Sequence, residues 1–191
     1  KTQPSSGRVR FTAIDLTKLS EHQIVRAGVG RKFQTPSVYE DLTVIENFEI
    51  SLPEGQGVFG SLFFRRDARV MERITSIAEQ VFLRDQLDQK AGRLSHGQKQ
   101  WLEIGMLLIQ SPQLLLLDEP VAGMSPRERE QTADLLNRIS SGKSVIVIEH
   151  DMDFVKRIAH KVTVLHQGRL LSEGSAAEVQ EDPRVIDVYL G

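Results

Sequence analysis

Two adjacent carboxylates, Asp118 and Glu119, are the first residues of the sequence whose type and spacing suit catalysis. They follow four apolar residues, 114–117, which predict a strand buried on both faces that ends at the two acids. Because Mg²⁺ prefers oxygen ligands and keeps several waters, one carboxylate suits a magnesium ion. The other points elsewhere and suits a general base that polarises an attacking water. The alternative interpretation is a strand end with two solvated acids, and this motif alone does not separate the two.

A second stretch, 94–98, has residue types that suit anion binding. Ser95 can cap the helix that follows, and Gly97 lets a backbone amide approach a ligand closely. The free N–H groups at the start of a helix attract a negative charge such as a phosphate. The alternative is a plain capped helix with nothing bound, and this stretch taken alone favours that alternative.

The elements that must position these residues follow from the apolar periodicity of the chain. Strand and helix patterns alternate along the chain. The strand patterns at 114–117 and 144–148 consist of apolar residues, apart from Ser144 at the start of the second. This order predicts an α/β fold with a parallel sheet and helices packed on it. In such sheets the chemistry lies at the carboxyl ends of the strands, and Asp118, Glu119 and His150 fall there.

Helix starts are marked by a Ser or Thr followed three residues later by Glu or Gln, which is the pattern of a capping box. The pairs are Ser20 with Gln23, Thr43 with Glu46, Ser125 with Glu128, and Ser175 with Glu178, the last opening the final regular helix. Apolar spacing predicts further helices over 67–82, over 98–109 and after Asp151. Short strands are expected at 8–11 and at Leu16, and a hairpin over 161–172.

The composition is that of an ordinary globular protein. Of 191 residues, 40% are hydrophobic and 26% charged, so a packed core is expected. The formal net charge of −2 argues against a dedicated nucleic-acid binder, and no nucleic-acid partner is expected. The absence of Cys excludes disulfides and thiolate metal sites. No signal peptide is visible, and no apolar run approaches the roughly 20 residues of a membrane span, so any membrane association is expected to be peripheral.

In combination and in order, these features resemble the ATPase domains of ABC transporters. The order is Leu-Ser-x-Gly-Gln, a helix, a strand that ends in Asp-Glu-Pro, and a strand that ends at His150, and the resemblance covers essentially the whole chain. It implies that the protein binds and hydrolyses ATP with Mg²⁺. It also implies that Asp118 is the Walker B aspartate, Glu119 the catalytic base, and His150 the switch histidine that contacts the γ-phosphate.

The same resemblance implies roles for residues outside the two acids. Gln34 corresponds to the Q-loop glutamine, which contacts Mg²⁺ or water and reports to the membrane partner, so Gln34 and Asp118 are the expected magnesium-binding residues. Ser95, Gly97 and Gln98 correspond to the signature that meets the γ-phosphate of ATP held by an opposing subunit.

A fold and a set of partners follow from this resemblance. The expected fold is a P-loop NTPase-like core with a mostly parallel sheet and a helical signature subdomain. A single domain, 1–191, is expected, with 1–42 and 111–191 as the catalytic core and about 43–110 as the helical subdomain. The expected partners are a second ATP-binding subunit, transmembrane permease subunits and, indirectly, a solute-binding protein. The expected location is the cytoplasmic side of the bacterial inner membrane.

The sequence departs from the family pattern in two places. The Walker A motif G-x-x-x-x-G-K-[ST], whose amides and Lys hold the phosphates, does not occur in the sequence. The turn expected at 4–7 matches the one that follows the Walker A helix, so we expect that motif to lie upstream of Lys1 in a longer parent. In addition, Ser125 stands where many ABC domains place an Asp at the end of the D-loop, and we interpret Ser125 mainly as a helix cap.

Several stretches resemble one class within the family more than others. Residues 31–36, 119–124 and 148–155 are similar to the branched-chain amino acid and urea or amide uptake class of bacteria. The run 30–47 most resembles the urea importer ATPases, so urea or a related small amide is the expected solute, and branched-chain amino acids are the alternative. The ending 182–191 resembles the short C-terminal tail of that class, which makes a natural C-terminus the expectation.

Two functions of other kinds stay open at this point. An ABC ATPase that acts on nucleic acids or ribosomes usually carries long coiled coils or a second ATPase domain, and neither pattern is present in the sequence. A truncated chain could also serve only as a non-catalytic interaction module. The retained Glu119 and His150 argue against a degenerate parent, although they do not exclude this reading for the chain by itself.

We expect the 191-residue chain alone neither to bind Mg-ATP tightly nor to hydrolyse it, because its sequence lacks the Walker A motif. Calorimetric titration of the purified chain with Mg-ATP measures this directly. A dissociation constant in the low-micromolar range would contradict the expectation.

Overall fold

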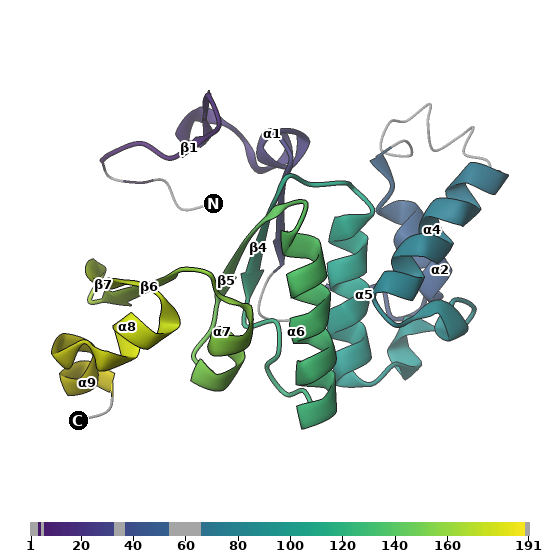
Figure 1. Cartoon of the computed structure of the whole chain (residues 1–191). Coiled ribbons are helices and arrows are strands. Elements are labelled where there is room, and N and C mark those ends of the chain that lie inside the picture. Colours follow the sequence, from purple (N-terminus) through teal and green to yellow (C-terminus); the bar gives the residue numbers. More distant parts are fainter. Residues whose placement is uncertain (1–3, 5, 33–36, 54–65, 190–191) are drawn as a thin grey trace.

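The computed structural model describes residues 4, 6–32, 37–53 and 66–189, and its centre is a parallel sheet (Figure 1). The sheet has the order β3 (Val29–Lys32), β4 (Leu114–Asp118), β5 (Ser144–Ile148). Leu115 pairs with Gly30 on one side and with Val145 on the other, and all three strands run in the same direction. The α/β fold with a parallel sheet is therefore confirmed.

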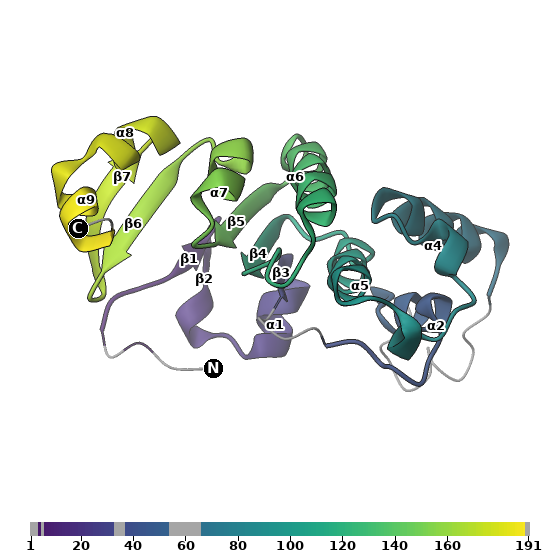
Figure 2. The ribbon, with the colours of Figure 1, turned by 90° about the horizontal axis from the view of Figure 1, so that it is seen from below.

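Three helices lie along one face of this sheet: α5 (His96–Leu108), α6 (Pro126–Ser140) and α7 (Met152–Ile158) (Figure 2). Leu115 and Leu117 point to that face and are completely buried or nearly so. Trp101 of α5 is buried as well, and its indole N–H donates to the Thr132 hydroxyl on α6 at 2.9 Å. The hydrophobic core therefore lies between the sheet and these helices.

The other face of the sheet is more open than the sequence predicts. Side chains alternate along a strand, so Ile146 and Ile148 point away from the helices, and they are 54% and 63% exposed. Leu116 is on the same face and is half-buried. The expectation that residues 114–117 form a strand buried on both faces is only partly right for β4, and the apolar strand predicted at 144–148 has one exposed face as β5. A run of apolar residues indicates that a strand tends to be buried. Whether each of its faces is buried depends on which other elements of the described chain pack against that face.

A group of helices packs beyond α5, at one end of the molecule (Figures 1 and 2). It contains α2 (Val44–Ile50), α4 (Ala68–Gln80) and two short 3₁₀ turns, η3 (Arg84–Gln86) and η4 (Ala91–Arg93). Phe48, Ile74 and Ile104 are fully buried where these helices meet. The division of the chain into a core and a helical subdomain stays a prediction.

The remaining elements lie before and after the sheet. They are β1 (Arg10–Phe11), β2 (Ile14–Asp15), η1 (Leu16–Lys18), α1 (Glu21–Arg26), β6 (Val162–His166), β7 (Arg169–Gly174), α8 (Ala176–Glu181) and α9 (Pro183–Tyr189). The expected hairpin is present as β6 and β7. Leu16 begins a 3₁₀ turn and is not in a strand, because Asp15 accepts a hydrogen bond from the Thr17 amide and caps that turn. The helix after Ser175 is not the last one, since α9 follows it.

Each predicted capping box is present. Ser20, Thr43, Ser125 and Ser175 accept from the amide three residues on, and the Glu or Gln there accepts from the amide of the cap. Within the described part of the chain, no helix is long and apolar enough to cross a membrane.

Gly105 of α5 gives a direct test of the packing in the helical group. A Cβ atom there would lie 2.7 Å from Cε1 of Phe48, so we expect Gly105→Ala to lower the free energy of unfolding. The expected loss is about 1–3 kcal/mol, even though Ala favours a helix more than Gly does. Urea denaturation of the purified chain measures it.

Gly142→Ala is the matched control, because a Cβ at Gly142 would meet nothing within 4 Å. We expect it to change the free energy of unfolding by less than about 0.5 kcal/mol. Equal stability of the Gly105→Ala variant and the wild type would show that α5 and α2 are not packed as described.

Candidate functional site

Glu119 and His150 meet at the carboxyl edge of the sheet. Asp118, the last residue of β4, pairs with Ile148, the last residue of β5, and each is followed within two residues by a candidate catalytic group. The Glu119 amide donates to the Ile148 carbonyl at 2.9 Å, which extends the pairing by one residue. Nδ1 of His150 lies 3.7 Å from Oε1 of Glu119. Groups separated by 31 positions in the sequence thus lie side by side.

Glu119 adopts a backbone conformation that is unusual for its residue type. Its φ is +44°, in the left-handed region that Glu rarely occupies. Such a conformation costs on the order of 1–3 kcal/mol and persists where the surrounding structure enforces it, often at functional sites. This conformation occurs directly after Asp118, where β4 ends.

The two expected magnesium-binding residues are Gln34 and Asp118. Gln34 lies outside the described residues, whereas Asp118 lies on the open face of the sheet beside Ile148. The residues that the structure describes contain no group of three or more His, Asp and Glu placed to hold a metal ion. Mg²⁺ is commonly held by one or two carboxylates together with water and substrate phosphates, so Asp118 fits such an ion as part of a shared set of ligands.

A hollow in the open face of the sheet adjoins Asp118. It is lined by Arg31, Lys32, Leu116, Leu117, Asp118, Ile146 and Ile148, and its volume is about 130 Å³. Sites that enclose a small organic ligand have volumes of roughly 300–1,000 Å³. This hollow is therefore too small to enclose a nucleotide by itself.

The signature residues Ser95 and Gln98 form a complete capping box at the start of α5. The Gln98 amide donates to the Ser95 hydroxyl oxygen at 3.2 Å, and the Gln98 side-chain oxygen accepts from the Ser95 amide at 3.0 Å. In this arrangement the Gln98 side chain is therefore used to cap α5, so it would have to leave the Ser95 amide in order to contact a ligand. The helix begins at His96, two residues earlier than the sequence predicts, because Ser95 is the cap.

Gly97 is packed against the Glu128 carboxylate of α6, and a Cβ at Gly97 would overlap that carboxylate. Oε1 of Glu128 lies 3.4 Å from the Ser95 hydroxyl, which donates to it. Hydrogen bonds from the amide and hydroxyl of Ser125 lower the pKa of Glu128, so it carries a negative charge at neutral pH. The sequence assigns Gly97 to ligand approach, whereas the structure adds an intramolecular reason for a glycine.

His96, the variable residue of the signature, contacts the segment that follows Glu119. Its Nε2 lies 3.1 Å from the Ala122 carbonyl oxygen and 3.3 Å from the Gln100 side-chain nitrogen. Gly123, with a φ of +71°, places its Cα beside the His96 ring. His96 therefore links the start of α5 to the turn after Glu119.

Lys32 and Glu103 form a buried ion pair that was not predicted from the sequence. Lys32 on β3 is completely buried, and its Nζ lies 3.7 Å from Oε2 of Glu103 on α5 and 3.5 Å from the Asp118 carbonyl oxygen. The other oxygen of Glu103 accepts from the Ser37 amide at 3.2 Å. Lys32 and Ser37 lie on either side of the undescribed residues 33–36, so Glu103 holds both flanks of the stretch that contains Gln34.

Burial governs the electrostatics of this pair. It lowers the pKa of Lys32 and raises the pKa of Glu103, and each partner opposes the shift of the other. At 3.7 Å the two groups form an ion pair, and none of the described residues donates a hydrogen bond to Oε2 of Glu103. The signal available in the sequence was a Glu inside a helix whose neighbours Trp101, Leu102 and Ile104 are all apolar.

Comparison with known proteins identifies the family. The ABC transporter sequence profile matches residues 1–122. The chain is 33% identical to the high-affinity branched-chain amino acid transport ATP-binding protein BraF of Pseudomonas aeruginosa, over 99% of the chain and 78% of that relative. The chain belongs to the ABC transporter ATP-binding family. It is also 30% identical to the Escherichia coli protein LivG, which has the same descriptive name, with the same coverage.

Solved structures of the family agree with the described fold. An ATP-binding cassette of an ABC transporter matches with a TM-score of 0.83 and 29% identity, over 98% of this chain and 78% of that one. The ADP conformation of an ATP-binding cassette matches with a TM-score of 0.80 and 32% identity, with the same coverage. The ABC ATPase fold and the assignment of the protein to the ABC ATPases are therefore confirmed. A second profile, described as branched-chain amino acid ATP-binding cassette transporter, matches residues 169–191 of this ABC ATPase.

The buried ion pair leads to a prediction about stability. We expect Lys32→Met to lower the free energy of unfolding by about 3–5 kcal/mol, because it leaves the Glu103 carboxylate buried without its counter-charge. Adding Glu103→Gln should recover part of this loss, since Gln keeps an acceptor for the Ser37 amide. Urea denaturation of the two variants and the wild type gives the values.

Lys99→Met serves as the control, because Lys99 pairs with Glu40, whose side chain is 63% exposed. Loss of such a pair costs about 0–1 kcal/mol. Equal losses for Lys32→Met and Lys99→Met would mean that the Lys32–Glu103 pair is not buried as described.

Proposed function

We propose that this ABC ATPase is the ATP-binding and hydrolysing subunit of an importer for branched-chain amino acids. The observation that carries the catalytic part of the proposal is the approach of Glu119 to His150, 3.7 Å apart at the carboxyl edge of the sheet. The solute is supported by the relatives, which are named for branched-chain amino acid transport, and by the matching profile over residues 169–191.

In this proposal each residue at the edge of the sheet has one role. Asp118, with Gln34, would hold Mg²⁺, which when bound would stabilise negative charge on the phosphates of ATP. Glu119 accepts a proton from the water that attacks the γ-phosphate. His150, beside Glu119, donates a hydrogen bond to the γ-phosphate and keeps it in line with that water. These residues act mainly by positioning and by electrostatic stabilisation, as in phosphoryl transfer generally.

The signature of a second subunit would complete each site. Ser95, Gly97 and Gln98 begin α5, where free amides and the helix dipole favour an anion. For this contact the Ser95 hydroxyl must turn from Glu128 to the phosphate, and Gln98 must release the Ser95 amide. The proposed partners are therefore a second ATP-binding subunit and two permease subunits, fed by a solute-binding protein, at the cytoplasmic side of the inner membrane.

The transported solute distinguishes this proposal from the urea interpretation. The resemblance of 30–47 to urea importers favours urea or a related amide, whereas the named relatives and the profile at 169–191 favour branched-chain amino acids. None of the described residues belongs to a solute site in either reading, because the solute passes through the permease. The second candidate solute is therefore tested in the same experiment.

The test uses the complete ATP-binding subunit that contains these residues, assembled with its permease and binding protein in vesicles. We expect uptake of labelled leucine that depends on ATP, and Glu119→Gln should reduce both hydrolysis and uptake by about 10³-fold or more while ATP still binds, because Gln cannot accept the proton. Uptake of labelled urea in place of leucine would overturn the proposed solute. Undiminished hydrolysis by the Glu119→Gln variant would overturn the catalytic assignment.

A further inference from the structure

The turn after Glu119, residues 121–124, is attached at its first residue to a side chain next to His150. The Val121 amide donates to Oε1 of Glu149 at 3.3 Å. The second oxygen of the same carboxylate accepts from the His150 amide, also at 3.3 Å. A single carboxylate therefore joins the start of the 121–124 turn to the backbone of His150.

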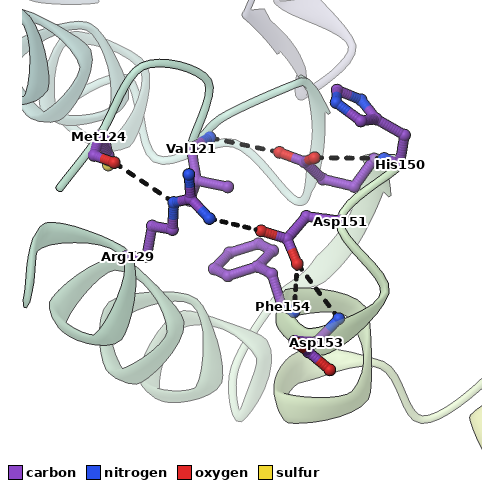
Figure 3. Close-up of polar contacts among 8 residues, drawn as sticks. Val121, Met124, Arg129, His150, Asp151, Asp153 and Phe154 are labelled. Atoms are coloured by element: carbon purple, nitrogen blue, oxygen red, sulfur yellow. Dashed lines mark hydrogen bonds and ion pairs between the residues drawn. The ribbon is translucent and has the colours of Figure 1, made fainter. Parts of the chain in front are cut away.

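The end of the same turn is attached to the residue on the other side of His150 (Figure 3). Nε of Arg129 on α6 donates to the Met124 carbonyl oxygen at 3.3 Å, and its Nη1 donates to Oδ2 of Asp151 at 2.8 Å. Oδ1 of Asp151 accepts from the amides of Asp153 and Phe154, at 3.1 Å each, and so caps α7. Asp151 thus holds both the start of α7 and, through Arg129, the end of the turn.

Within the described part of the chain, the His150 ring approaches Glu119 and is mostly open to solvent. The side chain is 79% exposed, and its ring points away from the Arg129–Asp151 pair (Figure 3). Its backbone, by contrast, lies between the two anchored neighbours Glu149 and Asp151. The position of the ring relative to Glu119 therefore depends on where these two neighbours hold the backbone.

The 121–124 turn also touches the signature. The Ala122 carbonyl oxygen lies 3.1 Å from Nε2 of His96, the second residue of the signature Ser95–Gln98. The turn therefore lies between the start of α5 on one side and the backbone of His150 on the other. The same four residues therefore contact both places.

We propose that Glu149, Arg129 and Asp151 are positioning residues that couple the 121–124 turn, and through it the signature, to His150 within one chain. The inference rests on the proposed function, because it assumes that His150 serves ATP hydrolysis. In this proposal the three side chains act through His150 and not on the nucleotide, because they set the distance between His150 and Glu119. Their loss lowers the rate of the chemical step and leaves ATP binding in place.

The chain offers a matched control on the same two helices. Arg157 of α7 pairs with Glu130 of α6 at 3.3 Å, and both side chains are exposed. This ion pair also joins α6 to α7, and its two partners are neither residues of the 121–124 turn nor the neighbours of His150. An effect on helix packing alone would appear equally in both pairs, whereas the proposed coupling belongs only to Arg129 and Asp151.

The experiment measures steady-state ATP hydrolysis by the complete ATP-binding subunit assembled with its permease. The variants are Arg129→Gln, Asp151→Asn, their combination, and Arg157→Gln. Asn at 151 keeps an oxygen that can cap α7, so this variant separates the ion pair from the cap. Thermal unfolding of each variant verifies that it is folded, which is expected because exposed ion pairs contribute little to stability.

We expect kcat to fall about tenfold in Arg129→Gln and Asp151→Asn, with KM for ATP within about twofold of the wild type, since misplacement of a catalytic group slows the chemical step. The combined variant should be no slower than either single one, because both remove the same link. Arg157→Gln should match the wild type. In a His150→Ala background, Arg129→Gln should leave the residual rate unchanged.

The outcomes separate this inference from the function on which it rests. Undiminished hydrolysis in Glu119→Gln would overturn the proposed function and the inference with it. If Glu119→Gln is inactive but Arg129→Gln equals Arg157→Gln, the inference alone is overturned. An additive loss in the combined variant, or a further loss in the His150→Ala background, would also overturn it, because Arg129 would then act by another route.

Discussion

The parallel pairing of β4 with β5 is the constraint on which the arrangement of this molecule depends. It places Asp118 opposite Ile148, and the bond from the Glu119 amide to the Ile148 carbonyl carries the pairing beyond the last strand residue. Because parallel strands end at one edge, the residues that follow the two strands, Glu119 and His150, meet there. A shift of one residue would point Asp118 to the helix-covered face and separate the two groups.

The helices on the covered face of the sheet also contact residues at this carboxyl edge. Lys32 lies under α5 with Glu103, and its ammonium also reaches the Asp118 carbonyl oxygen. The start of α5 meets Ala122 through His96, and the start of α6 meets Ser95 through Glu128. The side of the sheet that carries the core thus supports the edge that carries the candidate catalytic groups.

Local signals in the sequence predicted a large part of this fold. The capping boxes at Ser20, Thr43, Ser125 and Ser175 were found because both partners lie within four residues of one another. Apolar runs predicted β4 and β5, and the signature and the Asp-Glu pair led to the family that the comparisons show. The roles of the site residues are still predictions, and Gln34 lies outside the described residues.

The features that could not be predicted from the sequence depend on contacts between residues far apart in the chain. Lys32 and Glu103 are 71 positions apart in the sequence. The apolar periodicity of a chain does not show which charged residues will pair with each other in the interior. The left-handed φ of Glu119 also has no signal in its residue type, since Gly or Asn would be expected there. Exposure of Ile146 and Ile148 depends on which elements cover the open face, so the apolar pattern of β5 alone predicted the wrong environment for them.

The packing of Gly97 against Glu128 has a consequence for reading mutational scans of this motif. A side chain at Gly97 displaces a carboxylate that closes the capping box of α6, so a defective variant reports strain inside one chain as well as any lost phosphate contact. Intolerance to substitution at a signature glycine is therefore not, by itself, a measure of nucleotide recognition. Testing Gly97 variants in a chain with a smaller side chain at position 128 would separate the steric clash with Glu128 from a lost contact with the phosphate.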